Sequence, residues 1–424
     1  MPARAKLVGH ENTVSSFYGM FPYPWRPMFF DTISDPAFHE TFVRQEVGRS
    51  DTGPFADIWV AGCGTNQALI TALRFPLARV LGTDVSAESL AICAENAGKV
   101  GVTNLRLEQQ GITHSGHDRE FDLVICTGVV HHNPEPERCL RRLAAALRDD
   151  GVLELMVYNR FHRVESSAFQ EALGILLPGD DSDHRARLAS ARALAGSIRV
   201  ESTLTQSLRA MADSPEPDWA DVWTNPCEKS YDVRTLSRLA GECGLLLEAP
   251  KVNAIDKANN LFRWTLDLAD TGLRDRFCAL PDEARWQLVN LLHLNRSPML
   301  WFYLRPDRNG AGRVSDVDRN RLFLDSVLDR PTAVKRRYLL GDDGGYTLDP
   351  RATPVRKLPA PAAVRDIWEQ VDGTRTGREI FAETGRGMDF NSVYEARVML
   401  TTPEFPHVTL VPPAHAATNG WART

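Results

Sequence analysis

Short runs of apolar, β-type residues alternate with helical stretches from Asp57 to about Tyr158. This alternation is typical of βαβ units, whose strands lie parallel in one sheet. The runs are almost continuously apolar, as expected for strands that are buried on both faces. The expected strands span residues 58–61, 80–83, 105–108, 123–127 and 152–157. The sequence therefore predicts a doubly wound α/β core with a mostly parallel sheet.

The residues after Tyr158 are dominated by helical patterns. An Arg/Ala-rich stretch from about Asp183 to Met211 predicts a helical insertion at about residues 160–225. A helix followed by a strand is expected within Tyr231–Pro250. The apolar run Met299–Leu304 is the expected last strand of the core.

A polar stretch, Arg305–Arg319, predicts a linker and places a domain boundary near residue 310. The length of 424 residues also favours more than one domain. We therefore expect an N-terminal segment at 1–50, a core domain at 51–310 and a small C-terminal module at 320–412.

The composition, with 43% hydrophobic and 25% charged residues, is that of a globular protein without a membrane-spanning segment. A net charge of -6 argues against a nucleic-acid backbone as the main partner. The first residues show no secretory signal pattern, so we expect a cytoplasmic location. The seven cysteines include no CxxC pair, which indicates reduced thiols and no metal site.

The segment Val60–Gln67 lies between an expected strand and an expected helix. Gly62 and Gly64 let the backbone approach a ligand, and the following helix presents free N–H groups at its N-terminus. A nicotinamide-binding turn would need a third glycine at position 67, where this chain has glutamine. Asp84 ends the second strand, where an acid can accept hydrogen bonds from both ribose hydroxyls. The pattern indicates a nucleotide-like cofactor.

From Asp57 to Asn159 the chain resembles the class I S-adenosylmethionine (SAM)-dependent methyltransferases. The glycine turn, the stretch Phe121–His132 and the turn Arg148–Leu153 follow one another in the order found in that family. The resemblance implies a Rossmann-like, seven-stranded fold with SAM as cofactor. The residues that it places around SAM are Ala61, Gly62, Cys63, Gly64, Thr65, Gln67, Asp84, Val85, Gln110, Gly111 and Thr127.

Two family positions that usually carry an acid are Val60 and Gly111 in this chain. The second acid often contacts the adenine amine, and the side-chain amide of Gln110 is the expected replacement acceptor. Asn66 stands at the third glycine of the family's turn, where we expect it to tolerate left-handed geometry.

The candidate catalytic residues lie where two strands end. His131 and His132 follow the fourth strand, at the edge where open α/β sheets bind ligands, and Tyr158 and Asn159 follow the fifth. Histidine titrates near neutral pH and suits orientation of a substrate or acceptance of a proton. The alternative is that these residues cap the loop or line the adenine.

An aromatic and proline cluster spans Phe17–Pro27. Its prolines predict a rigid extended segment rather than a helix, and residues 1–16 show no clear period. The cluster resembles an element that covers the cofactor in one branch of the methyltransferase family. A sulfonium cation is attracted to aromatic faces, which makes Tyr18, Tyr23 and Trp25 cofactor-contact candidates. The alternative is a hydrophobic clamp that holds the N-terminus against the sheet.

Methyl transfer from SAM requires alignment and removal of a proton, but no metal or covalent nucleophile. We expect the acceptor to be an amine or hydroxyl of a small metabolite, in specialised metabolism, because the helical insertion is large enough to roof a pocket. One alternative is a peptide or protein acceptor docked by the C-terminal module, which resembles small winged-helix modules. Another is a SAM-binding sensor that has lost its chemistry.

Overall fold

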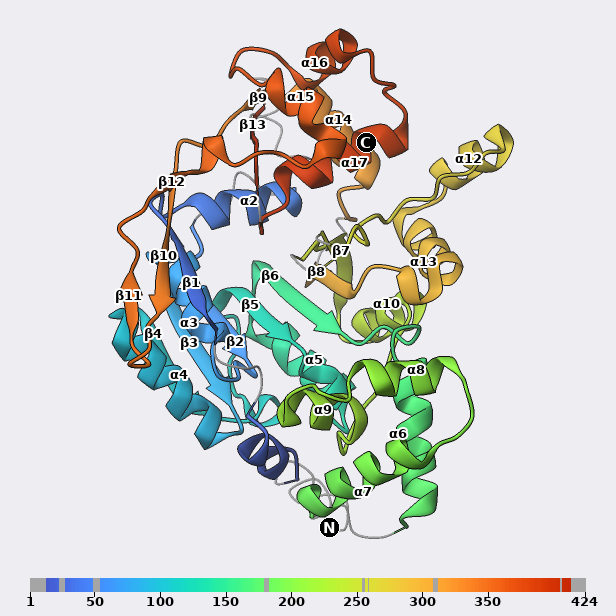
Figure 1. Cartoon of the computed structure of the whole chain (residues 1–424). Coiled ribbons are helices and arrows are strands. Elements are labelled where there is room, and N and C mark those ends of the chain that lie inside the picture. The colour runs from blue at the N-terminus through green and yellow to red at the C-terminus, as the bar shows by residue number, and fades with distance from the viewer. Residues whose placement is uncertain are drawn as a thin grey trace.

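The computed structural model describes residues 13–22, 27–48, 54–178, 183–253, 256–257, 259–307, 312–404 and 406–412. Its centre is a seven-stranded sheet with the strand order β4-β3-β2-β5-β6-β8-β7 (Figure 1). Only β8 runs antiparallel to its neighbours, which confirms the predicted mostly parallel, Rossmann-like sheet. The strands are β2 (Asp57–Ala61), β3 (Arg79–Asp84), β4 (Leu105–Gln109), β5 (Phe121–Thr127), β6 (Leu147–Val157), β7 (Leu245–Pro250) and β8 (Leu300–Pro306).

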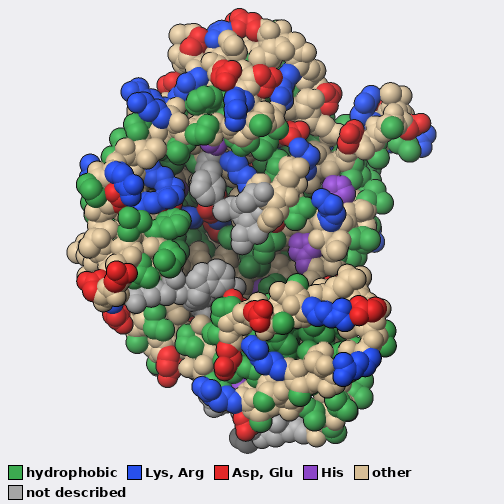
Figure 2. Space-filling view, in the orientation of Figure 1, with side chains coloured by type: hydrophobic (Ala, Val, Ile, Leu, Met, Phe, Trp, Pro, Cys, Tyr) green, Lys and Arg blue, Asp and Glu red, His purple; other side chains and the backbone are tan. Residues whose placement is uncertain are grey.

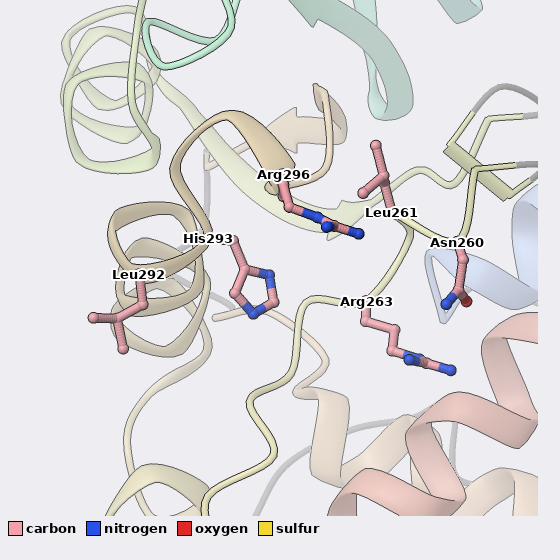
Figure 3. A pocket seen from close by; sticks show the side chains of 6 residues that line it. All are labelled: Asn260, Leu261, Arg263, Leu292, His293 and Arg296. Carbon is pink, nitrogen blue, oxygen red and sulfur yellow. The ribbon is translucent and has the colours of Figure 1, made fainter.

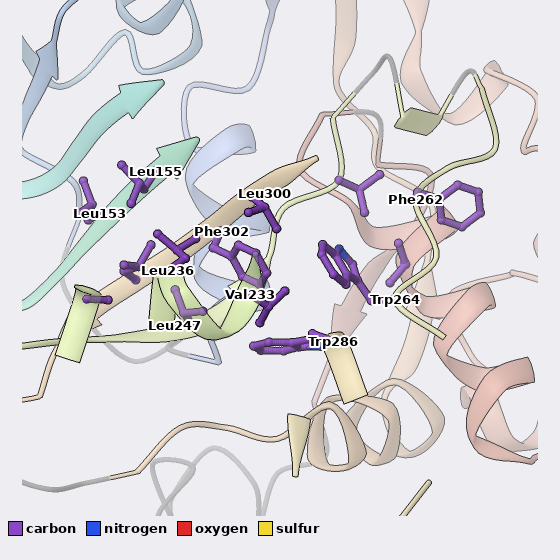
Figure 4. Close-up of a cluster of buried hydrophobic side chains, with 14 of the residues drawn as sticks. Leu153, Leu155, Val233, Leu236, Leu247, Phe262, Trp264, Trp286, Leu300 and Phe302 are labelled. Carbon is purple, nitrogen blue, oxygen red and sulfur yellow. The ribbon is translucent and has the colours of Figure 1, made fainter. Parts of the chain in front are cut away.

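Both faces of this sheet are covered, because alternate side chains of each strand enter two separate apolar clusters. Leu153 and Leu155 of β6 enter one cluster, whereas Val152 enters the other. The first cluster includes Trp286 and Phe302, which are fully buried (Figure 4). The helices α5 (Pro136–Ala146), α10 (Val233–Glu242) and α13 (Asp282–His293) supply that cluster, and α3 (Gln67–Arg74) and α4 (Ala87–Val100) supply the other.

The segment expected to be an insertion, at about 160–225, contains helices between β6 and α10. They are α6 (Val164–Leu176), α7 (His184–Ser197), α8 (Thr203–Ala210) and α9 (Glu216–Trp223). These helices form an apolar cluster of their own, in which Phe169 packs edge-on against Trp223. Phe17 and Phe21 from the N-terminal part of the chain complete this cluster. The insertion therefore packs against the N-terminus of the described chain.

Residues 13–20 are helical, so the extended segment predicted from Phe17 onward is wrong for its first four residues. The helix ends just before Pro22, and a proline restricts the residue before it without preventing a helix further upstream. The prediction of no regular structure before residue 17 is wrong for residues 13–16. The strand β1 (Phe29–Ile33) and the helix α2 (Phe38–Glu46) follow.

The C-terminal region does not stand apart from the core. Its strand β10 (Val334–Leu340) pairs antiparallel with β1, and buried residues such as Phe323 and Val408 belong to the same apolar cluster as β6. The other elements are α12 (Thr271–Cys278), α14 (Asp316–Asp325), β9 (Val327–Asp329), β11 (Tyr346–Leu348), β12 (Thr353–Pro354), α15 (Arg365–Glu369), α16 (Gly377–Thr384), α17 (Phe390–Thr401) and β13 (Thr409–Val411). None of the described helices is long and apolar enough to span a bilayer.

The expected linker at 305–319 contains the start of α14, which begins after Ser315. Its polar residues Asp316 and Arg319 are buried rather than solvated. Arg319 pairs with Glu248 of β7 at 2.8 Å, and Arg397 of α17 pairs with Asp316 at 3.2 Å. The polar composition therefore reflects buried ion pairs that join the two regions.

Candidate cofactor and acceptor site

The turn from β2 into α3 lies under the loop that follows β5. Gly62 has a φ of +74°, and a side chain on it would collide with Val129 in that loop. The backbone N–H groups of Gly62 and Cys63 both donate to the Thr83 carbonyl, at 2.8 and 2.9 Å. A glycine is therefore required here, because the backbone is left-handed and closely approached.

Asp84 stands at the carboxyl end of β3 with both of its oxygens held in place. Oδ2 accepts the Gly64 N–H at 2.8 Å and Oδ1 accepts the Ser86 N–H at 2.9 Å. Burial raises the pKa of Asp84, and the two N–H groups oppose this shift. Each carboxylate oxygen keeps a second lone pair. The residue can therefore accept two hydroxyls, as the ribose of a nucleoside requires.

Gln110, like Asp84, has a polar group placed where SAM would need one. Its backbone N–H donates to the Asp84 carbonyl at 2.9 Å, which places it beside the expected ribose acceptor. Its side-chain oxygen Oε1 is buried and has no hydrogen-bond partner among the described residues. Buried polar atoms are rarely left without a partner, so this oxygen is suited to a ligand donor such as the adenine amine. Gly111 follows it, before the 3₁₀ turn Ile112–His114.

Asn66 replaces the family's third glycine for a different reason from the one expected. Its φ is -149°, so it does not adopt left-handed geometry. Its side chain instead accepts a hydrogen bond from Asn96 of α4 at 3.0 Å and donates to Thr65 at 2.8 Å. The amide therefore ties the cofactor turn to the next helix.

The structure places the other expected cofactor residues at the same edge of the sheet, apart from Gln67, Tyr23 and Trp25. Ala61 and Thr127 end β2 and β5, and the Val85 carbonyl accepts from Gln109 at 3.0 Å. Gln67 lines a small cavity of about 20 Å³ on the α3 side of the sheet, together with Arg74. Tyr23 and Trp25 lie outside the described residues.

His131 and His132 form a 3₁₀ turn with Val130, directly after the loop that covers Gly62. The His131 ring is fully buried and stacks on Tyr158 with 3.8 Å between ring centroids. Neither of its ring nitrogens has a hydrogen-bond partner within the described ranges. The Nδ1 of His132, in contrast, lies 2.8 Å from the Cys227 carbonyl. Both ring nitrogens of His131 are therefore buried without a partner, whereas Nδ1 of His132 is engaged.

Asp221 joins the N-terminal helix to this edge of the sheet. Its Oδ1 accepts from the Tyr18 hydroxyl at 2.9 Å, and its Oδ2 accepts from the Tyr158 hydroxyl at 3.0 Å. Asn225 donates to Tyr18 at 3.2 Å. Burial, and then the negative charge of Asp221, raise the pKa of Tyr18 well above its ordinary value, so this tyrosine stays protonated. Sequence reasoning missed Asp221, because its partners come from distant parts of the chain.

Asn159 lies at the same strand end, but its side chain is engaged in internal hydrogen bonds. It donates to Ser297 Oγ at 2.8 Å and to the Pro298 carbonyl at 3.1 Å, and it accepts from the Phe161 N–H. These contacts fix the entry into β8.

The N-terminal helix lies across the cofactor loops. Ser15 donates to the Val85 carbonyl at 3.1 Å, and the Gly19 backbone packs against Glu88 of α4. In Figure 1 this dark-blue helix lies below the arrowheads of β2 and β3, beside α9. The position agrees with a cover over the cofactor site.

Comparisons with known proteins agree with this geometry. The model of a methyltransferase domain family matches residues 59–153. An uncharacterised protein of Synechococcus sp. is 28% identical over 310 residues, which are 68% of this chain and 72% of that protein. A tRNA U34 carboxymethyltransferase of Campylobacter jejuni subsp. doylei is 26% identical over 31% of this chain, and the match spans only 47% of that enzyme.

Among solved structures, PKMT2 from Rickettsia typhi in complex with AdoHcy matches with a TM-score of 0.55 and 12% identity. The match covers 92% of this chain and 77% of PKMT2, so the likeness in fold includes the C-terminal region. The sheet order, the glycine turn with Asp84, and the matched domain lead to one conclusion. The chain carries a class I methyltransferase domain and is a SAM-dependent methyltransferase.

Proposed function

We propose that this enzyme methylates an amine or hydroxyl of a small metabolite, and that His131 accepts the proton that the acceptor loses. The observation that carries this proposal is the fully buried His131 ring, whose two nitrogens have no partner in the described part of the chain. A buried polar atom without a hydrogen bond costs about 1–3 kcal/mol. An acceptor that donates to this ring would remove that cost.

The His131 ring is suited to act as a base rather than an acid. Burial lowers its pKa well below the ordinary value of 6.5, and the neighbouring His132 and Arg163 lower it further. The imidazole is therefore neutral at pH 7, with a lone pair on one ring nitrogen. SAM supplies a methyl group on positively charged sulfur. With SAM bound, the acceptor's lone pair would form the new bond to that carbon as the methyl–sulfur bond breaks, S-adenosylhomocysteine would leave, and His131 would take the acceptor's proton.

Asp221 supports this assignment through its charge and its position. It contributes a carboxylate to the cluster around His131 and Tyr158, where the tyrosine hydroxyl donates to it at 3.0 Å. Its negative charge would attract an amine acceptor to this edge of the sheet. Asp221 comes from α9 and Tyr18 from the N-terminal helix, so both elements close over the acceptor edge. Such enclosure favours a small acceptor over a folded macromolecule.

The test is a methyl-transfer assay with labelled SAM and a panel of amines, hydroxyl compounds and peptides. With the best acceptor, His131→Gln should reduce kcat by about 10²–10⁴-fold, the usual contribution of a general base. Binding of S-adenosylhomocysteine should be unchanged. Because the pKa of His131 is depressed, kcat of the native enzyme should not fall near pH 6.5. His117→Gln is the matched control, since His117 pairs with Glu120 before β5, at the opposite edge of the sheet.

Normal turnover by the His131→Gln variant would rule out this base. Transfer to peptides alone would overturn the small-metabolite acceptor and favour docking by the C-terminal region.

A further inference from the structure

A pocket of about 320 Å³ lies beyond the acceptor cluster, between the segment after β7 and the end of α13 (Figure 3). It is lined by Asn260, Leu261, Arg263, Leu292, His293 and Arg296. Figure 3 shows the side chains of Arg263, His293 and Arg296 around one central space, whereas Leu292 points away from it. Figure 2 shows that the molecule is hollowed between its C-terminal region and the helices α6 to α9. The polar lining of this pocket is predominantly cationic.

The cations of this pocket are only partly neutralised. Arg263 pairs with Glu395 of α17 at 2.5 Å, but its Nε is buried and has no partner among the described residues. Arg296 is exposed, and no described residue forms an ion pair or hydrogen bond with it. His293 is half-buried, and burial, then the charge of Arg296, lower its pKa. Two guanidinium groups therefore face one carboxylate, which leaves a net positive charge.

The backbone around the pocket is strained. Asn260 and Leu294 have φ values of +59° and +52°, and they are two of the three described non-glycine residues with positive φ. Asparagine tolerates this region, but leucine does so rarely. Leu294 begins the 3₁₀ turn Leu294–Arg296, which carries Arg296. Strain of this kind concentrates at ligand-binding sites.

The pocket lies at the same edge of the sheet as His131. Ser297, the residue after Arg296, accepts a hydrogen bond from Asn159, next to Tyr158. The segment 259–263 follows β7, which runs parallel to β6 and ends at this edge. The strands β5 and β7 are three positions apart in the sheet, and neighbouring strands are about 4.8 Å apart. The pocket and the acceptor cluster therefore lie along the same edge of the sheet.

We infer that this pocket binds an oxyanion, a carboxylate or a phosphate, at the far end of the methyl acceptor. The inference rests on the proposed function, in which the acceptor's nucleophile lies at His131. A guanidinium matches both oxyanions with paired N–H donors, and the imidazole can add a further donor. The acceptor would be an extended, acidic small molecule. Its nucleophile and its acid would lie at opposite ends of one sheet edge.

The first experiment measures anion binding without any methyl transfer. Inorganic phosphate and malonate are titrated into the full chain with S-adenosylhomocysteine present, and the His293 imidazole is followed by NMR. Bound anion should raise the pKa of His293 and the Tm of the protein. Arg296→Gln should weaken binding by about 10–100-fold, as expected for loss of a charged hydrogen bond. Arg276→Gln, at an exposed arginine of α12, is the control and should have no effect. The anion that binds more tightly, phosphate or malonate, identifies the class of acid that the acceptor carries.

The second experiment compares acceptors that carry a free acid with the corresponding methyl esters or amides. The acid should be preferred, and Arg296→Gln should raise KM for the acid with little change in kcat. If methyl transfer continues but no anion binds, or if the acid and the ester are used equally well, the inference is overturned. Absence of transfer to every acceptor, with anion binding intact, would instead overturn the proposed function and the link between this anion site and the acceptor.

Discussion

Asp84 is held by two backbone N–H groups that come from different parts of the chain, the cofactor turn and the start of α4. Its orientation is therefore fixed before any ligand arrives. A carboxylate that is already oriented loses little side-chain entropy when it binds a hydroxyl. The affinity for the ribose should depend strongly on this single side chain.

We predict that Asp84→Ala weakens binding of S-adenosylhomocysteine by about 10–100-fold, because hydrogen bonds to a charged group contribute about 1.5–3 kcal/mol. Isothermal titration calorimetry measures the change. Asp57→Ala is a control at the other end of the sheet, where that carboxylate pairs with Arg79 and Arg148. An unchanged affinity in the Asp84 variant would show that the ribose is held elsewhere.

The sequence singles out Gly62, Asp84 and Gln110 as cofactor candidates because each follows a strand at the edge where such sheets bind ligands. It does not predict Asp221, which lies in an ordinary-looking helix and acquires its role from Tyr18 and Tyr158. Long-range side-chain contacts of this kind have no local pattern. The interpretation of Asn66 failed for the same reason, since its partner Asn96 belongs to another helix.

At the scale of elements, the helix formed by residues 13–20 is attached by few polar contacts. Ser15 binds Val85, and Tyr18 binds Asp221. Each hydrogen bond contributes only about 0.5–1.5 kcal/mol, so the helix can detach without unfolding the sheet. Packing of Phe17 and Phe21 against the insertion opposes that opening.

We predict that S-adenosylhomocysteine slows chymotrypsin cleavage after Phe17 and Tyr18, because a filled cofactor site stabilises the closed helix. Mass spectrometry of timed digests measures the rates. Tyr18→Phe, which removes only the hydroxyl bound to Asp221, should lower turnover with little change in Tm. Equal cleavage rates with and without ligand, or a large loss of Tm in the variant, would assign the helix a purely structural role.

The expected strands agree closely with the observed ones, as β5 shows, expected at 123–127 and observed at Phe121–Thr127. Continuous apolar character identifies such strands, because both faces of the sheet are buried. The sequence does not predict the N-terminal helix, because the prolines that follow it indicate an extended segment. Its stability comes from packing on α9 and α4, which no short window of sequence contains.

At the scale of the whole molecule, Glu404 links the C-terminal region to the methyltransferase core. It forms a bidentate pair with Arg74 of α3 at 2.8 and 3.0 Å, and Lys251 approaches it at 3.1 Å. Lys251 also pairs with Glu154 of β6 at 2.5 Å. Burial opposes ionisation of Glu404, but Arg74 and Lys251 outweigh it and hold its pKa well below the usual range. The two regions therefore share a buried electrostatic network.

We predict that Glu404→Gln lowers the free energy of unfolding by about 3–5 kcal/mol, because it leaves buried cations without compensation. Urea titration measures this loss. Glu383→Gln breaks the exposed pair with Arg375 and should cost less than about 1 kcal/mol. Since the pKa of Glu404 is depressed on folding, its contribution is present above its unfolded pKa of about 4.5 and is lost as pH falls below it. Equal stability of the two variants would show that the regions are independent.

The boundary predicted near residue 310 rests on polar composition, and the structure shows that some of these polar residues are buried in ion pairs. Charged residues usually lie in contact with solvent, but Arg319 pairs with Glu248 inside the molecule. Composition cannot distinguish a solvated charge from a buried, paired one. Whether the last hundred residues form a winged-helix-like module stays a prediction.

The pairing of β1 with β10 also determines when the fold can be completed. The register joins Phe30 to Tyr338, so the partner of an early strand is made only after about three hundred further residues. A ribosome adds about 5–20 residues each second, so β1 waits on the order of tens of seconds during synthesis. Throughout that interval its segment, FFDTI, has an open edge that can associate with other chains. Production of this enzyme in cells should therefore depend on chaperones and on the rate of translation.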